Sequence, residues 1–93
     1  MKRCIVQLFG LPREITELRE VEVELTDEAN LGDVIAALRR EIPALEERVI
    51  RAGENRLMEH CAFNINGRFY LDDKEAHLQD GDRVVLLTLA TGG

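Results

Sequence analysis

The residues best suited to chemistry stand at the carboxyl end of the chain, where the apolar run 84–89 leads into Ala90-Thr91-Gly92-Gly93. Glycine adds no packing to a strand and loses the most backbone freedom when it is ordered. A tail that ends in bare glycines can instead enter a narrow channel and present the Gly93 α-carboxylate to the active site of another protein. The alternative is a frayed terminus or a cloning remnant, because chain ends are often disordered. The preceding elements must decide between the two.

Other side chains that carry chemistry are sparse. Two cysteines, Cys4 and Cys61, are too few for a disulfide framework or a four-thiolate metal site, and each lies in an alternating apolar stretch typical of a buried hydrophobe. His60 and His77 lie far apart in the sequence and are interpreted as surface or strand-edge residues. No nucleophile–base pair, metal cluster or phosphate loop can be identified in the sequence. We therefore expect no metal site and no self-contained enzyme.

Length and composition limit the class of protein further. Ninety-three residues, 45% of them hydrophobic, suffice for one domain with one core. The formal net charge of −6 argues against a nucleic-acid partner and is compatible with docking on a basic protein surface. No apolar run approaches the roughly 20 residues that span a bilayer, and no signal-peptide pattern opens the chain. We expect a cytoplasmic protein with no membrane partner.

Periodicity predicts a hairpin and a helix in the first half of the chain. Strict alternation predicts strands at Arg3–Phe9 and Glu20–Leu25, separated by a break at residues 10–14 that contains glycine and proline. Asn30 is the predicted N-cap of a helix, and Asp33 completes a capping box. Five apolar residues recur at helical spacing and form one stripe: Leu31, Val34, Ile35, Leu38 and Ile42.

The second half contributes a short helix and three more strands. Pro43 is expected to open a helix that extends to Arg51, with Leu45, Val49 and Ile50 as its buried residues. Strands are predicted at Cys61–Ile65 and Arg68–Leu71, joined by a tight turn at Asn66-Gly67. An irregular segment anchored by Leu78 then leads to the last strand, at 84–89.

These elements predict an α+β fold whose sheet is covered on one face only. The last strand is apolar on both faces, which is typical of a central strand; Val84, Leu86 and Thr88 are assigned to the core. Its other face is expected to join the first strand in an exposed apolar patch that docks a protein partner. A homodimer contact or a covering loop is the alternative. The predicted patch comprises Ile5, Phe9, Val85, Leu87 and Leu89.

Four short motifs, in this order over the whole chain, resemble a known family. They are Phe9-x-x-x-Arg13-Glu14, Asn66-Gly67, Leu78-x-Asp80-Gly81-Asp82-x-Val84 and Thr91-Gly92-Gly93. Together they are similar to the β-grasp, ubiquitin-like sulfur carrier proteins. The greatest similarity is to the small, sulfur carrier subunit of molybdopterin synthase, with carriers of cysteine and thiamine biosynthesis as relatives.

The resemblance implies a β-grasp mixed sheet of order 2-1-5-3-4 with one main helix on one face. It implies a single domain over 1–93, with residues 90–93 as a flexible tail. The last strand would separate the two cysteines by about 9–10 Å, too far for a disulfide. The resemblance also implies that four residues meet the large subunit: Phe9, Arg13, Phe69 and Leu87.

The resemblance further implies chemistry at Gly93, with Gly92 bare beside it. In the family, a ubiquitin-activating-type adenylyltransferase uses ATP and Mg²⁺ to adenylylate this carboxylate, and sulfur then displaces AMP to leave a thiocarboxylate. The carrier itself binds no cofactor. Ala90 and Thr91 would enter the partner, either the molybdopterin synthase large subunit or another sulfur acceptor enzyme.

Three alternatives remain open. The chain could carry sulfur for cysteine, thiamine or tRNA thiolation. It could be a ubiquitin-like modifier that is joined to lysines through Gly93. It could also be a binding module whose Gly-Gly end is accidental.

Overall fold

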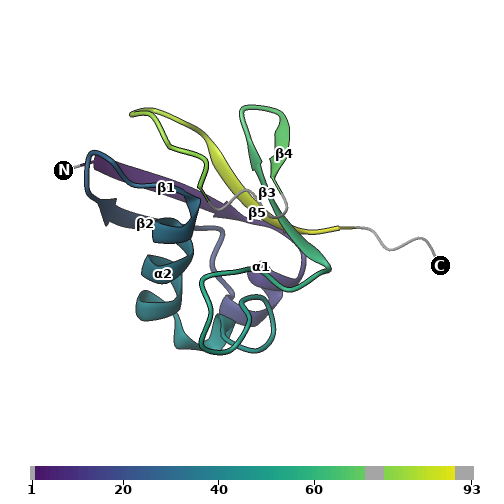
Figure 1. The fold of residues 1–93 in the computed structure, drawn as a ribbon. Helices are drawn as coiled ribbons and strands as arrows, with labels where there is room; N and C mark the ends of the chain where they lie inside the picture. Colours follow the sequence, from purple (N-terminus) through teal and green to yellow (C-terminus); the bar gives the residue numbers. More distant parts are fainter. Residues whose placement is uncertain (1, 71–74, 90–93) are drawn as a thin grey trace.

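A five-stranded mixed sheet organises the chain. The structure, a computed structural model, describes residues 2–70 and 75–89. The strands are β1 (Lys2–Leu8), β2 (Glu20–Leu25), β3 (Cys61–Ile65), β4 (Arg68–Tyr70) and β5 (Val84–Thr88). Their order is β2-β1-β5-β3-β4, and β5 is central, parallel to β1 and antiparallel to β3 (Figure 1). The predicted β-grasp order is confirmed.

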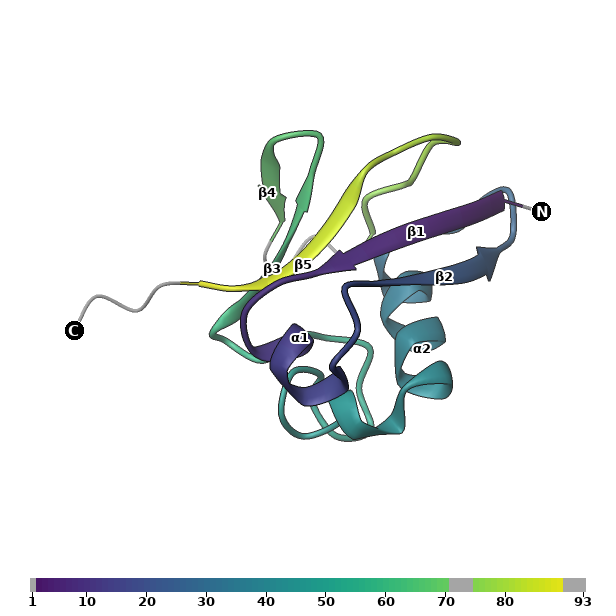
Figure 2. The same ribbon diagram turned by 180° about the vertical axis from the view of Figure 1, so that it is seen from behind.

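The main helix, α2 (Leu31–Glu41), covers one face of this sheet. Its amino end is closed by the predicted capping box, in which Asn30 Oδ1 accepts from the Asp33 amide and Asp33 Oδ2 accepts from the Asn30 amide, each at 3.0 Å. The core lies between this helix and the sheet. Figure 2 shows α2 and the shorter helix α1 (Leu11–Thr16) on the same side of the sheet, which leaves the opposite face without a helix. The most deeply buried core residues include Val6, Leu8, Leu31, Val34, Leu38, Phe63, Val84 and Leu86.

A second helix, α1 (Leu11–Thr16), occupies the segment that we expected to be an irregular break. The expectation was wrong because Pro12 stands in the first turn, where a missing N–H costs nothing. Gly10 precedes the helix at φ +67°, a conformation that favours glycine. The glycine and proline therefore begin an element here.

The predicted helix from Pro43 to Arg51 is also wrong. Only the single 3₁₀ turn η1 (Pro43–Leu45) forms. The chain then folds back on itself: the Glu47 amide donates to the Ile50 carbonyl at 2.7 Å, and Glu47 adopts φ +75°. Helical periodicity nevertheless identified the buried residues correctly, since Leu45, Val49 and Ile50 are fully buried.

The segment before β5 is held by a few specific contacts. Leu78 is buried as predicted, and its carbonyl accepts from Lys2 Nζ at 2.6 Å. Asp82 accepts from the Gln79 amide at 2.8 Å and from Asn66 Nδ2 at 3.1 Å, which ties the turn before β5 to the β3–β4 turn. Leu71, at the end of the predicted fourth strand, lies outside the described residues. Within residues 2–70 and 75–89, no helix is long and apolar enough to cross a membrane.

Both cysteines are buried on the core face with free thiols. As predicted, β5 lies between the strands that carry the two cysteines, and the strand registers separate them further along the sheet. The β5–β3 register pairs Cys61 with Thr88, whereas Cys4 precedes the β1–β5 ladder that begins at Val6. The cysteines therefore lie toward opposite ends of the sheet.

Burial raises the pKa of the Cys61 thiol to about 11. The pKa of the Cys4 thiol is also raised, mainly by burial and in addition by the negative charge of Asp82. Protonated, inaccessible thiols are poor nucleophiles.

Gly10→Ala should destabilise the fold through a clash with β5. A Cβ on Gly10 would come within 2.7 Å of Thr88 Oγ1. Gly53→Ala is the matched control, because Gly53 has a similar φ of +71° and a Cβ added there would meet no atom within 4 Å. Overpacking should lower the free energy of unfolding of Gly10→Ala by about 1–3 kcal/mol more than that of the control. Urea unfolding measures both, and equal losses would contradict the clash.

Cys61 should make stability depend on pH in the alkaline range. Its pKa is 9.0 when exposed and about 11 in the fold, so the folded state holds the proton more tightly. This contribution is fully present below pH 9.0 and is lost as the pH rises toward about 11. The difference in free energy of unfolding between wild type and Cys61→Ala should therefore shrink over this range. A constant difference in urea unfolding would contradict the assignment.

Candidate functional site

The candidate site is the face of the sheet opposite the helices, which we call the outer face. At mid-sheet the strand registers align one row across all five strands: Glu20, Gln7, Val85, Asn64 and Phe69. Gln7 and Asn64 flank Val85 in this row. The apolar patch expected from alternation is therefore interrupted at its centre by two polar side chains.

The outer face is more apolar where β5 approaches the tail. Leu87 lies opposite Ala62, and the Phe9 amide donates to the Leu86 carbonyl at 3.0 Å, which extends the β1–β5 pairing by one step. The Leu89 amide donates to the His60 carbonyl at 2.7 Å and extends β5 in the same way. We call these residues the apolar end of the outer face: Phe9, Ala62, Leu87 and Leu89.

Exposure differs among these residues. Phe9 is 48% exposed, Leu87 and Leu89 are half-buried, and Ala62 is fully buried. Ala62 was missed by the sequence analysis, although its place between Cys61 and Phe63 in an alternating strand assigns it to the outer face. Its burial makes it part of the floor of the apolar end.

Two other predicted docking residues lie away from the apolar end. Ile5 and Phe69 are 47% and 54% exposed. Phe69 stands on the edge strand β4, two strands from Val85, which corresponds to about 10 Å. The structure thus spreads the predicted apolar residues over the outer face.

Arg13 lies on α1, which contacts the end of β5. It is exposed on this helix, which is joined to the end of β5 where the Leu11 amide donates to Thr88 Oγ1 at 2.7 Å. Thr88 was assigned to the core, but it is half-buried and its hydroxyl accepts the hydrogen bond from the first amide of α1. Leu18, just beyond α1, is 43% exposed and was not predicted.

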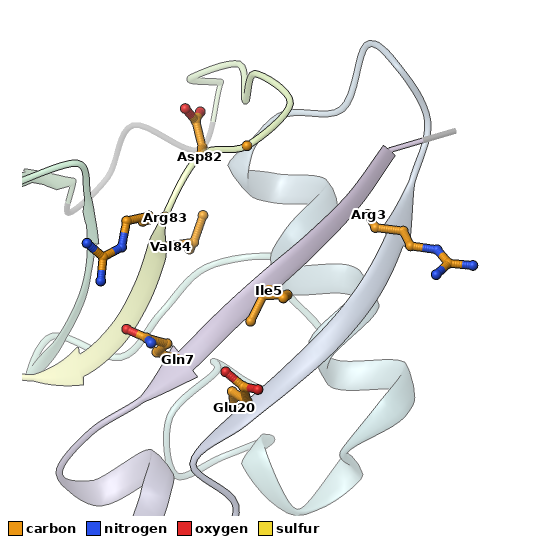
Figure 3. A pocket seen from close by; sticks show the side chains of 8 residues that line it. Arg3, Ile5, Gln7, Glu20, Asp82, Arg83 and Val84 are labelled. Carbon is orange, nitrogen blue, oxygen red and sulfur yellow. The ribbon is translucent and has the colours of Figure 1, made fainter.

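A groove opens at the far end of the outer face (Figure 3). It lies where β1 and the turn before β5 diverge, ahead of the Val6–Val84 pair that begins their ladder. Its volume is about 290 Å³, and Ile5 lines it together with side chains of both charges, Arg3, Arg83, Glu20 and Asp82. The mixed charges favour no single class of ligand.

The predicted tail residues Ala90, Thr91, Gly92 and Gly93 lie outside the described residues. The described chain reaches Leu89, which belongs to the apolar end and whose amide donates to the His60 carbonyl.

Comparison with known proteins shows what the chain is similar to. Residues 6–93 match the ThiS family. The chain is 31% identical over 90 residues to small archaeal modifier protein 3 of Haloferax volcanii, covering 95% of this chain and 96% of that protein. It is 33% identical over 89 residues to a molybdopterin synthase sulfur carrier subunit of Chlamydomonas reinhardtii, covering 95% of each.

Comparison with solved structures agrees with the family match. The crystal structure of small archaeal modifier protein 1 from Haloferax volcanii matches with a TM-score of 0.83 at 28% identity, covering 98% of this chain and 99% of that one. The family match extends over nearly the whole chain and includes β5 and the Gly-Gly end. This chain therefore belongs to the ThiS family, a group of β-grasp sulfur carriers and ubiquitin-like modifiers that are not themselves enzymes.

Proposed function

We propose that this chain is a cytoplasmic sulfur carrier that donates sulfur from a thiocarboxylate on Gly93, in the biosynthesis of molybdopterin. The observation that carries the proposal is the position of β5, a central strand whose outer face is apolar just before the sequence continues into Thr91-Gly92-Gly93. Because β5 is paired with a strand on each edge, the residue from which the proposed reactive tail starts is held in place. The sulfur carrier subunit that is 33% identical supports the choice of pathway.

The chemistry begins with activation of the carboxylate. A carboxylate resists nucleophiles because it is negatively charged and has a poor leaving group. In a ubiquitin-activating-type adenylyltransferase, an oxygen of the Gly93 carboxylate attacks the α-phosphorus of Mg²⁺-bound ATP, and the bond to pyrophosphate breaks. ATP and Mg²⁺ belong to the partner, and this chain supplies only the carboxylate.

Sulfur then replaces AMP. The terminal sulfur of a persulfide attacks the acyl carbon, AMP leaves, and an acyl disulfide forms. A second thiol then attacks the sulfur that came from the persulfide's own cysteine, so that the thiocarboxylate leaves and the two thiols are joined in a disulfide. The chain's own thiols are unsuited to carry this sulfur, because Cys4 and Cys61 are buried with raised pKa values. The transferable sulfur therefore resides on the tail, which a partner can recognise and enclose.

The outer face supplies the docking energy. Burial of apolar surface contributes roughly 25 cal/mol per Å², before the entropic cost of association. In this proposal, Phe9 and Leu87 at the apolar end contact the partner that receives the tail. The proposed partners are the adenylyltransferase and then the molybdopterin synthase large subunit, which would bind the same end in turn.

A second candidate function is a protein modifier. Small archaeal modifier protein 3, 31% identical to this chain, favours it. Here a substrate lysine would attack the activated Gly93 and form an amide. Carriers for cysteine, thiamine or tRNA thiolation would share the activation step and differ only in the acceptor.

Intact-mass analysis of the protein from its native host separates these functions. A sulfur carrier should show a terminal mass gain equal to the exchange of one oxygen for sulfur. A modifier should instead appear in lysine-linked conjugates. Copurified partners should include the molybdopterin synthase large subunit if the pathway is correct, and recovery with a different acceptor enzyme would reassign it.

Tail variants should block activation without affecting the fold. Gly93→Ala, and more strongly Gly92→Val, place a Cβ where the channel of the partner requires bare backbone. Deletion of Gly92 and Gly93 should abolish sulfur transfer. The free energy of unfolding should stay within about 0.5 kcal/mol of wild type in each case, because the proposal assigns these residues to a tail outside the core, and substitutions away from packed features rarely exceed this. Normal thiocarboxylate formation by Gly92→Val, measured by mass, would contradict the hypothesis that the channel of the partner requires bare backbone.

Phe9→Ala should weaken binding to the adenylyltransferase from the same host. Loss of a large apolar side chain at the centre of a docking surface should raise the Kd about tenfold, or about 1.4 kcal/mol. Leu18→Ala is the matched control, since Leu18 is comparably exposed (43% against 48%) but lies beyond α1. Calorimetry measures both affinities. Equal losses for the two variants would mean that docking does not centre on the apolar end.

A further inference from the structure

One hydroxyl links α1 to the end of β5. The Leu11 amide donates to Thr88 Oγ1 at 2.7 Å, across 77 positions of sequence. Leu11 is the first residue of α1, and first-turn amides have no acceptor within their own helix. Gly10, the residue at the N-cap position, makes no side-chain cap. Thr88 therefore caps α1 from a different element of the fold.

The approach is close because Gly10 has no side chain. A Cβ there would lie 2.7 Å from Thr88 Oγ1 and 3.2 Å from Thr88 Cβ. The helix begins at once, since the Glu14 amide donates to the Gly10 carbonyl at 3.0 Å. The backbone at Gly10-Leu11 is thus packed directly on the Thr88 side chain.

Flanking backbone bonds hold the surroundings of this contact. The Phe9 amide donates to the Leu86 carbonyl at 3.0 Å, and the Leu89 amide donates to the His60 carbonyl at 2.7 Å. Between these bonds, the Thr88 hydroxyl is the polar link from β5 to the helix. With six residues, α1 is too short to persist without tertiary contacts. The described tertiary contacts of α1 are this hydrogen bond and the packing of Leu11, Pro12 and Ile15 on the core.

We propose that Thr88 is a positioning residue that fixes α1, and with it Phe9 and Arg13, beside the start of the tail. An enzyme that takes Gly93 then meets these exposed side chains and the tail in one arrangement. The inference rests on the proposed function and adds to it a positioning residue on β5. Binding to the activating enzyme should depend on the hydroxyl, because without it the first turn of α1 loses its hydrogen bond to β5 and is held by apolar packing alone.

The variants are chosen to isolate the hydroxyl. Thr88→Val keeps the shape and the β-branch but leaves the Leu11 amide without an acceptor, and Thr88→Ser restores the oxygen. Thr16→Val is the matched control: the Thr16 hydroxyl donates to the Pro12 carbonyl at 2.9 Å and accepts from the Leu18 amide at 3.1 Å, so it acts within α1 and its carboxyl end.

Hydrogen exchange of the full chain tests the structural step. Thr88→Val should speed exchange of the Leu11 amide by about tenfold or more, with core strands unchanged, and Thr88→Ser should return it toward the wild-type rate. Thr16→Val should leave the Leu11 amide protected. Wild-type protection of Leu11 in Thr88→Val would overturn the proposal.

ATP–pyrophosphate exchange with the adenylyltransferase from the same host tests the functional step, because it reports adenylylation of Gly93 alone. Thr88→Val should raise the KM for this chain about tenfold while kcat stays within about twofold, and Thr88→Ser should restore the KM. Thr16→Val should match wild type.

The outcomes separate the proposed function from the positioning role. Absence of exchange with the wild-type chain would overturn the proposed function and the positioning role with it. Exchange by wild type, together with an unchanged KM for Thr88→Val or equal effects of Thr88→Val and Thr16→Val, would overturn the positioning role alone. A loss confined to kcat would also overturn it.

Discussion

The pairing of β5 with β1 on one side and β3 on the other is the constraint on which the rest of the structure depends. A strand in the middle of a sheet is buried by neighbours on both edges, so both of its faces favour apolar side chains. The helices cover only one of those faces (Figure 2). On the other face, β5 carries Val85 and Leu87, which are half-buried, and the same strand leads to the Gly-Gly end. The proposed docking surface and the proposed reactive tail thus belong to one strand.

The outer face is graded in its chemistry. On the edge strand β2, Glu20, Glu22 and Glu24 are exposed, and Arg3 lies 3.5 Å from Glu22 and 4.0 Å from Glu24. Exposed ion pairs of this kind contribute little to stability. A charged edge does, however, discourage pairing with another sheet edge. The apolar end lies on the inner strands beside the tail. The charged edge and the apolar end therefore lie on different strands of the outer face.

Local patterns predicted some elements and failed on others for identifiable reasons. The alternation of Glu20–Leu25 and the Asn30–Asp33 capping box are strong, self-contained signals, and both were correct. The signals at Gly10-Leu11-Pro12 were ambiguous, because glycine and proline mark a loop and also mark the start of a helix. The decision depended on whether a distant acceptor would cap Leu11. Around Leu45, Val49 and Ile50, periodicity identified the buried side chains but could not distinguish a helix from a folded-back loop.

By itself, the sequence determined most of the side chains that face the core, where the tight Asn66-Gly67 turn falls, and that residues 90–93 carry no bulky side chain. These properties depend on residue type and on neighbours within a few positions. Only the tertiary structure decided how the strands align. The register placed Gln7 and Asn64 on either side of Val85 and paired Ala62 with Leu87, and the fold brought Thr88 to the Leu11 amide. Contacts between residues so far apart depend on the packing of the whole sheet, and periodicity along the chain does not encode them.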